Sequence, residues 1–362
     1  MPDNKDLKER EKEAEKEPTS FSIESSNTST QKKVEKDEIP HFFPTYRIKG
    51  NLYSVPIIIV VICAGILAYL TYIEAGIQIE GGYVSEEQYG AAGGIINGII
   101  FTALAAGSAF LMIFFIKKFG INVLKYLFGL SFGFIGFFLS LFFSQIITYL
   151  IFVNFPETQT IVVTYYALVD WILPISIGVF TIVLLYNYFT TDSIKIKNFI
   201  VLYIGLLIGA MMGIIMPLWT TLAILIGVSL WDIFAVKSKR GPIKQMIDIA
   251  ATEFRNADQE DVSDLSEEEI QEKIDSGELI YDTSQLEIGI GDLAFYSMLT
   301  TAALLQTNSL LVMILTAAAI IIGTGITISG LKRNKILPGL PISIFLGIAT
   351  MLLSWGFLML FS

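Results

Sequence analysis

Apolar residues along the chain fall into long runs that short polar segments separate. Nine such runs recur between Leu52 and Phe361, and each approaches or exceeds the roughly 20 residues that a helix needs to cross a bilayer. Pro217 divides the fifth run from the sixth, because proline interrupts helical hydrogen bonding. The pattern predicts an all-α, polytopic membrane protein with nine transmembrane helices, at residues 52–73, 91–116, 123–153, 162–189, 199–216, 217–236, 288–305, 309–328 and 338–361.

Two longer segments are polar. Residues 1–49 alternate lysine, arginine and glutamate and then become rich in serine and threonine, a composition that predicts a largely disordered tail. Residues 237–287 contain 14 acidic and six basic residues, which gives this one loop a charge of −8 out of the chain's −10. Within the loop, apolar residues over 243–250 are spaced to form one helix face that can lie on a membrane surface. The loop belongs to a single membrane domain, predicted to cover residues 50–362.

Basic residues occur in every second connection between the predicted spans and are absent from the connections after spans one, three, five and seven. Lysine and arginine concentrate on the cytoplasmic side of membrane proteins. The alternation therefore predicts a multi-pass protein of the cell membrane with its N-terminus in the cytoplasm and its C-terminus outside. The basic residues are Arg47 and Lys49; Lys117, Lys118 and Lys125; Lys195 and Lys197; Lys237, Lys239, Arg240 and Lys244; and Lys332, Arg333 and Lys335.

Composition excludes several functional classes. The chain is 53% hydrophobic and only 16% charged, and its acidity argues against binding nucleic acid. It has one cysteine, Cys63, and one histidine, His41. A zinc protease needs two histidines in a His-Glu-x-x-His pattern, and a Ser-His protease needs a histidine at membrane depth. No metal and no cofactor is predicted.

Two aspartates lie inside otherwise apolar segments. Asp232 is about one helical turn before the cytoplasmic end of the sixth predicted span, and Asp292 is about one turn after the start of the seventh. A charged side chain at the bilayer centre costs about 2.5–3.5 kcal/mol on insertion scales, so such residues are rare and commonly functional. Because the two spans are antiparallel, both carboxyl groups lie about 6 Å inside the boundary and can face each other.

Two carboxyl groups held close together share one proton. In that state the ionised member can take a proton from a water that attacks a peptide carbonyl, while the protonated member donates to the carbonyl oxygen. Gly289 and Gly291 leave space beside Asp292 for an approaching backbone. Intramembrane aspartates also serve ion pathways, so a passive ion conduit or transporter is the alternative function. A third acid, Asp170, is interpreted as an interfacial or packing residue.

Three motifs resemble those of one family. The segments 230–234 (Leu-Trp-Asp-Ile-Phe), 289–292 (Gly-Ile-Gly-Asp) and 337–341 (Leu-Pro-Gly-Leu-Pro) fall in order on predicted spans six, seven and nine. This arrangement resembles the presenilin and signal peptide peptidase family of intramembrane aspartyl proteases, and it looks most like the archaeal presenilin homologues. The family pattern is Tyr-Asp, Gly-x-Gly-Asp and Pro-Ala-Leu. Prepilin-type peptidases share Gly-x-Gly-Asp, but they have fewer spans and lack the third motif.

The resemblance implies an aspartic endopeptidase of the Gly-x-Gly-Asp type that cleaves transmembrane helices in the bilayer. It gives Asp232 and Asp292 the catalytic role, and it gives the segment Pro338, Gly339 and Leu340 a role in positioning substrate beside Gly289 and Gly291. Two positions depart from the family pattern. Trp231 stands where the family has tyrosine, which removes a hydroxyl next to a catalytic acid, and Gly339 stands where the family has alanine.

Overall fold

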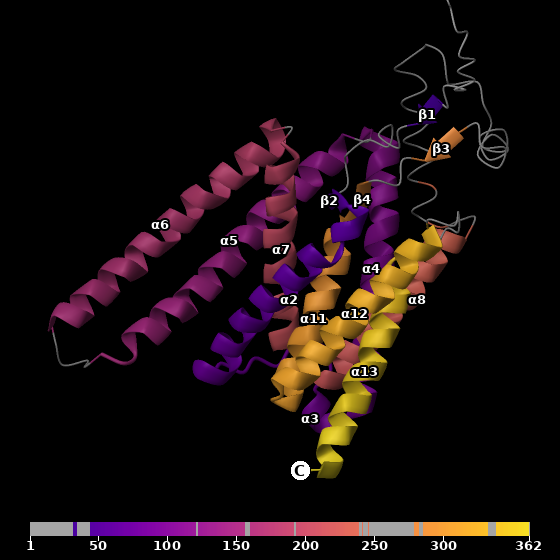
Figure 1. Ribbon diagram of the computed structural model, residues 1–362. Helices are drawn as coiled ribbons and strands as arrows, with labels where there is room; N and C mark the ends of the chain where they lie inside the picture. Colours follow the sequence, from indigo (N-terminus) through magenta and orange to yellow (C-terminus); the bar gives the residue numbers. More distant parts are fainter. Residues whose placement is uncertain are drawn as a thin grey trace, which may run out of the picture. The chain divides into compact units, whose positions relative to one another are not determined.

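The computed structural model describes residues 32–34, 44–120, 122–155, 160–191, 193–238, 241, 245, 279–281, 285–331 and 338–361, and these residues are mostly helical (Figure 1). The apolar segment after the tail begins with the short helix η2 (Gly50–Leu52), continues as α2 (Ser54–Tyr69) and ends in a π-helical turn, η3 (Leu70–Glu74). The remaining helices are α3 (Glu86–Tyr89), α4 (Ala91–Phe119), α5 (Val123–Phe152), α6 (Thr160–Thr190), α7 (Ile194–Ile215), α8 (Leu218–Lys237), α11 (Ile290–Thr307), α12 (Leu310–Leu331) and α13 (Leu340–Phe361).

Within the described residues, eight helices are long and apolar enough to cross a membrane. They correspond to every predicted span except the seventh, and the predicted break at Pro217 is present as the N-cap of α8. The multi-pass membrane class is therefore confirmed. The seventh span corresponds to α11, which has 18 residues and is shorter and less apolar than the eight candidate spans. The total of nine spans therefore remains a prediction.

The polar composition of α11 follows from its position in the fold. It packs against α2, α7, α8, α12 and α13 (Figure 1), and from Leu293 to Leu305 every residue except Phe295 is buried. A helix enclosed by other helices does not face lipid, so it tolerates Ser297 and Thr300, whose hydroxyls donate to carbonyl oxygens of their own helix. α11 is thus the central helix of the membrane domain, and it carries Asp292 in its first turn.

Close contact between α7 and α11 depends on glycines. Gly205, Gly209 and Gly213 recur every four residues on α7 and therefore share one face. A Cβ atom at Gly213 would lie 2.5 Å from Thr301 Cγ2, and one at Gly209 would lie 2.7 Å from Ser297 Cβ. Small residues at this spacing let two membrane helices approach closely, and here they fix the position of α11 against α7.

Two short two-stranded sheets accompany the helices. β1 (Lys32–Val34) pairs in parallel with β3 (Leu279–Tyr281), and β2 (Thr45–Lys49) pairs antiparallel with β4 (Gln285–Gly289). The sheets lie in separate units of the chain.

These strands differ from the sequence prediction in three places. β1 lies inside the predicted disordered tail. The last five residues of the predicted disordered tail form β2, and the predicted start of the seventh span, residues 288–289, is the end of β4. The predicted surface helix over 243–250 lies outside the described residues apart from residue 245.

Candidate active site

Asp232 and Asp292 project from two different helices near the ends that the sequence predicts to be cytoplasmic. Asp232 is in the last two turns of α8, and Asp292 is the third residue of α11. Both residues are half-buried, and two consecutive residues of the segment before α13 lie beside their carboxyl groups, Gly339 beside Asp292 and Leu340 beside Asp232. The structure therefore brings together the two acids that the sequence singled out, at the same end of the helix bundle.

The segment that leads into α13 contacts both acids. The backbone N–H of Leu340 donates a hydrogen bond to Oδ2 of Asp232, with 3.3 Å between nitrogen and oxygen. At the preceding residue, a Cβ atom on Gly339 would lie 3.4 Å from Oδ2 of Asp292. Pro338 removes a backbone donor just before this point. Two consecutive residues thus lie against the two carboxyl groups, and Pro338 and Leu340 are themselves buried.

The two glycines before Asp292 have different environments. Gly289 is both the last residue of β4 and the N-cap of α11, and a Cβ atom on it would lie 3.7 Å from Oδ2 of Asp292. Gly291 is exposed, and a Cβ there would meet only Phe295 Cε2, at 3.9 Å. The surface beside Asp292 is therefore open at Gly291, whereas the backbone of Gly289 lies close to the carboxyl group.

A buried tyrosine beside the acids was missed by the sequence analysis. Tyr296 is one helical turn beyond Asp292 on α11, and the residue is 2% exposed. Its hydroxyl donates to Ser343 Oγ of α13 at 3.3 Å and accepts a hydrogen bond from Thr324 Oγ1 of α12 at 3.5 Å. The hydroxyl groups of Ser343 and Thr324 are 3.0 Å apart. The spacing of four residues from Asp292 was the signal that could have identified it, because residues i and i+4 share a helix face.

The remaining two predicted positions lie away from this cluster. Trp231 makes an edge-on ring contact with Phe110 of α4, with 6.0 Å between ring centroids, and packs on Phe234 of its own helix. Asp170 lines a separate cavity of about 310 Å³ between α5 and α6, together with Gln145 and Tyr149. Asp170 is therefore not part of the carboxyl pair.

Comparison with protein families gives one family for most of the chain. The family model described as Presenilin matches residues 53–257 and 249–362. Presenilin-B of Dictyostelium discoideum is 36% identical over 149 residues, which are 40% of this chain and 27% of that protein. The matched stretch therefore spans about a quarter of that relative.

Comparison with solved structures supports the same fold. A presenilin family intramembrane aspartate protease superposes with a TM-score of 0.51, and the match covers 83% of this chain and 97% of the other. Its sequence identity is 12%, so this likeness bears on the fold alone.

Proposed function

The chain belongs to the presenilin family, and from this premise we propose that it is an intramembrane aspartic endopeptidase that hydrolyses peptide bonds of transmembrane helices. The observation that carries the proposal is that Leu340 donates a backbone hydrogen bond to Asp232 while the preceding residue, Gly339, lies beside the carboxyl group of Asp292. Two acids from different helices, held against one stretch of irregular backbone, are the arrangement that amide hydrolysis by a shared-proton pair requires.

In the proposed mechanism the two carboxyl groups hold one proton between them. The ionised carboxylate takes a proton from a water molecule as its oxygen attacks the peptide carbonyl, while the other carboxyl donates its proton to the carbonyl oxygen. The carboxyl group that took the proton from water then donates it to the amine nitrogen as the carbon–nitrogen bond of the tetrahedral intermediate breaks, and the other carboxylate takes a proton from a hydroxyl group of the intermediate. The products are a new carboxyl terminus and a new amine, and the pair again holds one proton.

Substrate must be locally unwound before this chemistry can occur, because a helix uses its own carbonyl groups in internal hydrogen bonds. We assign Gly289, Gly291 and the segment 338–340 to substrate positioning. Gly291 leaves an exposed surface beside Asp292, and Leu340 lies next to Asp232 through its backbone. The helix start at Leu340 supplies a break in regular structure at the depth of the acids. The proposed substrates are transmembrane-helix proteins or peptides in a lipid bilayer. We propose that the N-terminus of the protease lies in the cytoplasm, as the positions of the basic residues predict.

The experiment is incubation of the purified, full-length protein with a synthetic peptide that contains one apolar span, followed by mass spectrometry. We expect two fragments whose masses add up to that of the peptide plus one water, and we expect a hydroxyethylene peptide isostere to suppress their formation. An intact peptide, together with cation flux into proteoliposomes that the isostere does not inhibit, would contradict the proposal and favour an ion conduit.

A further inference from the structure

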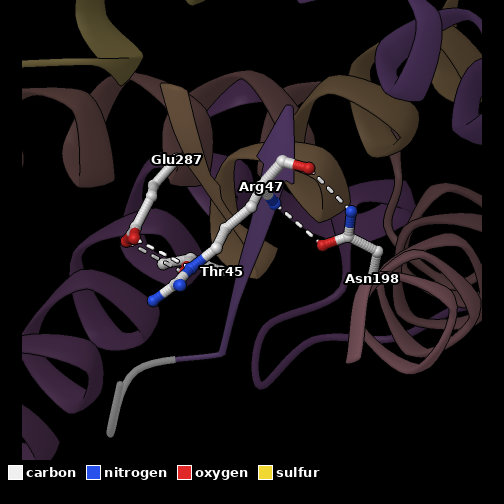
Figure 2. A network of polar contacts seen from close by, with 4 residues as sticks. All are labelled: Thr45, Arg47, Asn198 and Glu287. Carbon is white, nitrogen blue, oxygen red and sulfur yellow. Dashed lines mark hydrogen bonds and ion pairs between the residues drawn. The ribbon is translucent and has the colours of Figure 1, made fainter. Parts of the chain in front are cut away.

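A polar cluster joins three separate parts of the chain at the start of α11. Figure 2 shows its members: Thr45 and Arg47 on β2, Glu287 on β4 and Asn198 in the second turn of α7. The Arg47 Nε is 3.0 Å from Glu287 Oε1, and the Thr45 hydroxyl donates to Glu287 Oε2 at 3.0 Å. Both carboxylate oxygens of Glu287 are thus engaged by side chains of β2.

Asn198 holds the other edge of β2. The N–H of Arg47 donates to Oδ1 of Asn198 at 2.8 Å, and Nδ2 of Asn198 donates to the carbonyl oxygen of Arg47 at 2.7 Å (Figure 2). The side-chain amide therefore satisfies both backbone groups of one residue, as a neighbouring strand would. Since these groups point toward Asn198, the cross-strand pair of Arg47 and Glu287 is a non-hydrogen-bonded pair, in which opposing side chains lie closest.

The sheet needs this support because it has only two strands. β2 and β4 pair over five residues, and an isolated two-stranded ribbon is at best marginally stable in water. The side chain of Glu287 is 49% exposed, whereas that of Arg47 is 15% exposed, so solvent screens the ion pair on one side. The two hydrogen bonds from Asn198 anchor the ribbon to α7, the same helix against which α11 packs through its glycines.

The position of β4 determines the start of α11. No residue separates the two elements, and Gly289 both ends the strand and caps the helix. The Ile290 N–H donates to the Pro44 carbonyl at 3.2 Å, which extends the pairing into the first helical residue. Asp292 follows two residues later, and a Cβ atom on Gly289 would lie 3.7 Å from its Oδ2. A displacement of β4 is therefore transmitted to the carboxyl group of Asp292 without any flexible linker.

We propose that Asn198 is a positioning residue: by closing the free edge of β2 it keeps β4 and the first turn of α11 in the arrangement that presents Asp292 to Asp232. The catalytic consequence rests on the proposed function, but the order of β4 and α11 can be measured without it. The side chain of Asn198 is hydrogen-bonded to the backbone of Arg47, so it acts on Asp292 through the β2–β4 ribbon.

The test uses the full-length protein in detergent with two variants and one control. Asn198→Ala removes both hydrogen bonds, and Asn198→Leu removes them while keeping a side chain of similar size. The control is Asn187→Ala on α6, where the side-chain amide donates to Val183 of its own helix at 2.8 Å. Hydrogen–deuterium exchange is followed in the peptide that covers residues 286–292, and kcat and KM are measured separately on a single-span peptide.

For both Asn198 variants we expect exchange over 286–292 to be about tenfold faster, which corresponds to about 1.4 kcal/mol. We expect kcat to fall about tenfold while KM changes less than about twofold, and we expect the control to behave like wild type in both measurements. Unchanged exchange would overturn the anchoring role, and faster exchange with unchanged kcat would overturn the positioning role. A wild-type protein that does not cleave would contradict the proposed function, while the exchange measurement would still show whether Asn198 orders this segment.

Discussion

The contact between α7 and α11 gives a prediction whose size can be worked from the structure. Gly209→Ala places a methyl group that overlaps the Ser297 hydroxyl and lies 2.7 Å from Ser297 Cβ and 2.8 Å from the Ala294 carbonyl oxygen. Rotation of Ser297 can remove the first overlap but not the other two, because a Cβ atom and a backbone oxygen move only with the helix. The same substitution at Gly205 meets nothing closer than Leu293 Cβ at 3.5 Å, which is an ordinary contact.

The two substitutions form a matched pair. Both exchange glycine for alanine inside α7, so both gain about 1 kcal/mol of helix propensity. Overpacking a well-filled contact costs about 1–3 kcal/mol. Because Gly209→Ala makes two rigid contacts shorter than 3 Å, its overpacking cost should lie near the upper end of that range. We expect Gly205→Ala to be neutral or slightly stabilising and Gly209→Ala to lose about 2 kcal/mol. Because α11 carries Asp292, the second variant should also cleave peptide more slowly.

The assay is thermal unfolding of both variants in one detergent at one heating rate, followed by tryptophan fluorescence, together with cleavage of a single-span peptide. Gly209→Ala should unfold several degrees below wild type, and Gly205→Ala should not. If Gly209→Ala unfolded at or above the temperature of Gly205→Ala and cleaved normally, the argument that glycines fix α11 against α7 would be wrong.

Three further predictions concern topology and the surroundings of the acids. With Cys63 replaced by serine, a single cysteine at Ser362 should react with an impermeant reagent outside intact cells and one at Ser25 should not, since basic residues mark the cytoplasmic side; the opposite labelling would invert the topology. Gly339→Ala should change the cleavage rate by less than about threefold, because the added methyl makes an ordinary 3.4 Å contact with Asp292 Oδ2; near-complete loss would show that the backbone there needs glycine. Tyr296→Phe should cost only about 1 kcal/mol in thermal unfolding, because Ser343 and Thr324 remain 3.0 Å from each other; failure to fold would contradict this.

The local pattern of apolar residues was sufficient to predict the positions of the membrane helices. Apolar runs located eight spans to within a few residues, and Pro217 marked the break before α8 because a proline ends a helix through its own covalent structure. The predicted seventh span also matches a helix, α11, but this helix is less apolar than the other eight. Its Ser and Thr residues are tolerated because neighbouring helices, and not lipid, surround it.

Long-range pairing was not predictable from local pattern. β2 and β4 are about 240 residues apart, and each is five residues long. A strand of that length next to an apolar run carries no periodic signal of its own, so residues 285–289 were divided between a loop and a span. The role of Asn198 in anchoring β2 could not be predicted from the sequence either. A single side-chain amide in an apolar helix becomes informative only when its hydrogen-bond partner, the backbone of Arg47, is known.

The candidate site could be predicted only in part from the sequence. The depth of Asp232 and Asp292 followed from their distance to the ends of two antiparallel spans, whereas their juxtaposition depends on how α8 and α11 pack. The hydrogen bond from Leu340 to Asp232 could not be predicted, because it depends on where the start of α13 lies relative to α8. Tyr296 was overlooked because an aromatic residue on an apolar helix ordinarily indicates core packing, and only its hydrogen bonds set it apart.

The central claim is that Asp232 and Asp292 act as one catalytic unit. The most direct test is cleavage of one single-span peptide, across a range of pH, by wild type, Asp232→Ala, Asp292→Ala, the double variant and Asp170→Ala. Each single change should abolish cleavage and the double change should be no worse, because the effects of groups that share a proton do not add. Wild type and Asp170→Ala should both be active with a bell-shaped pH profile. Turnover by either single variant well above that of the peptide alone would contradict the claim and favour a role for these aspartates in ion passage.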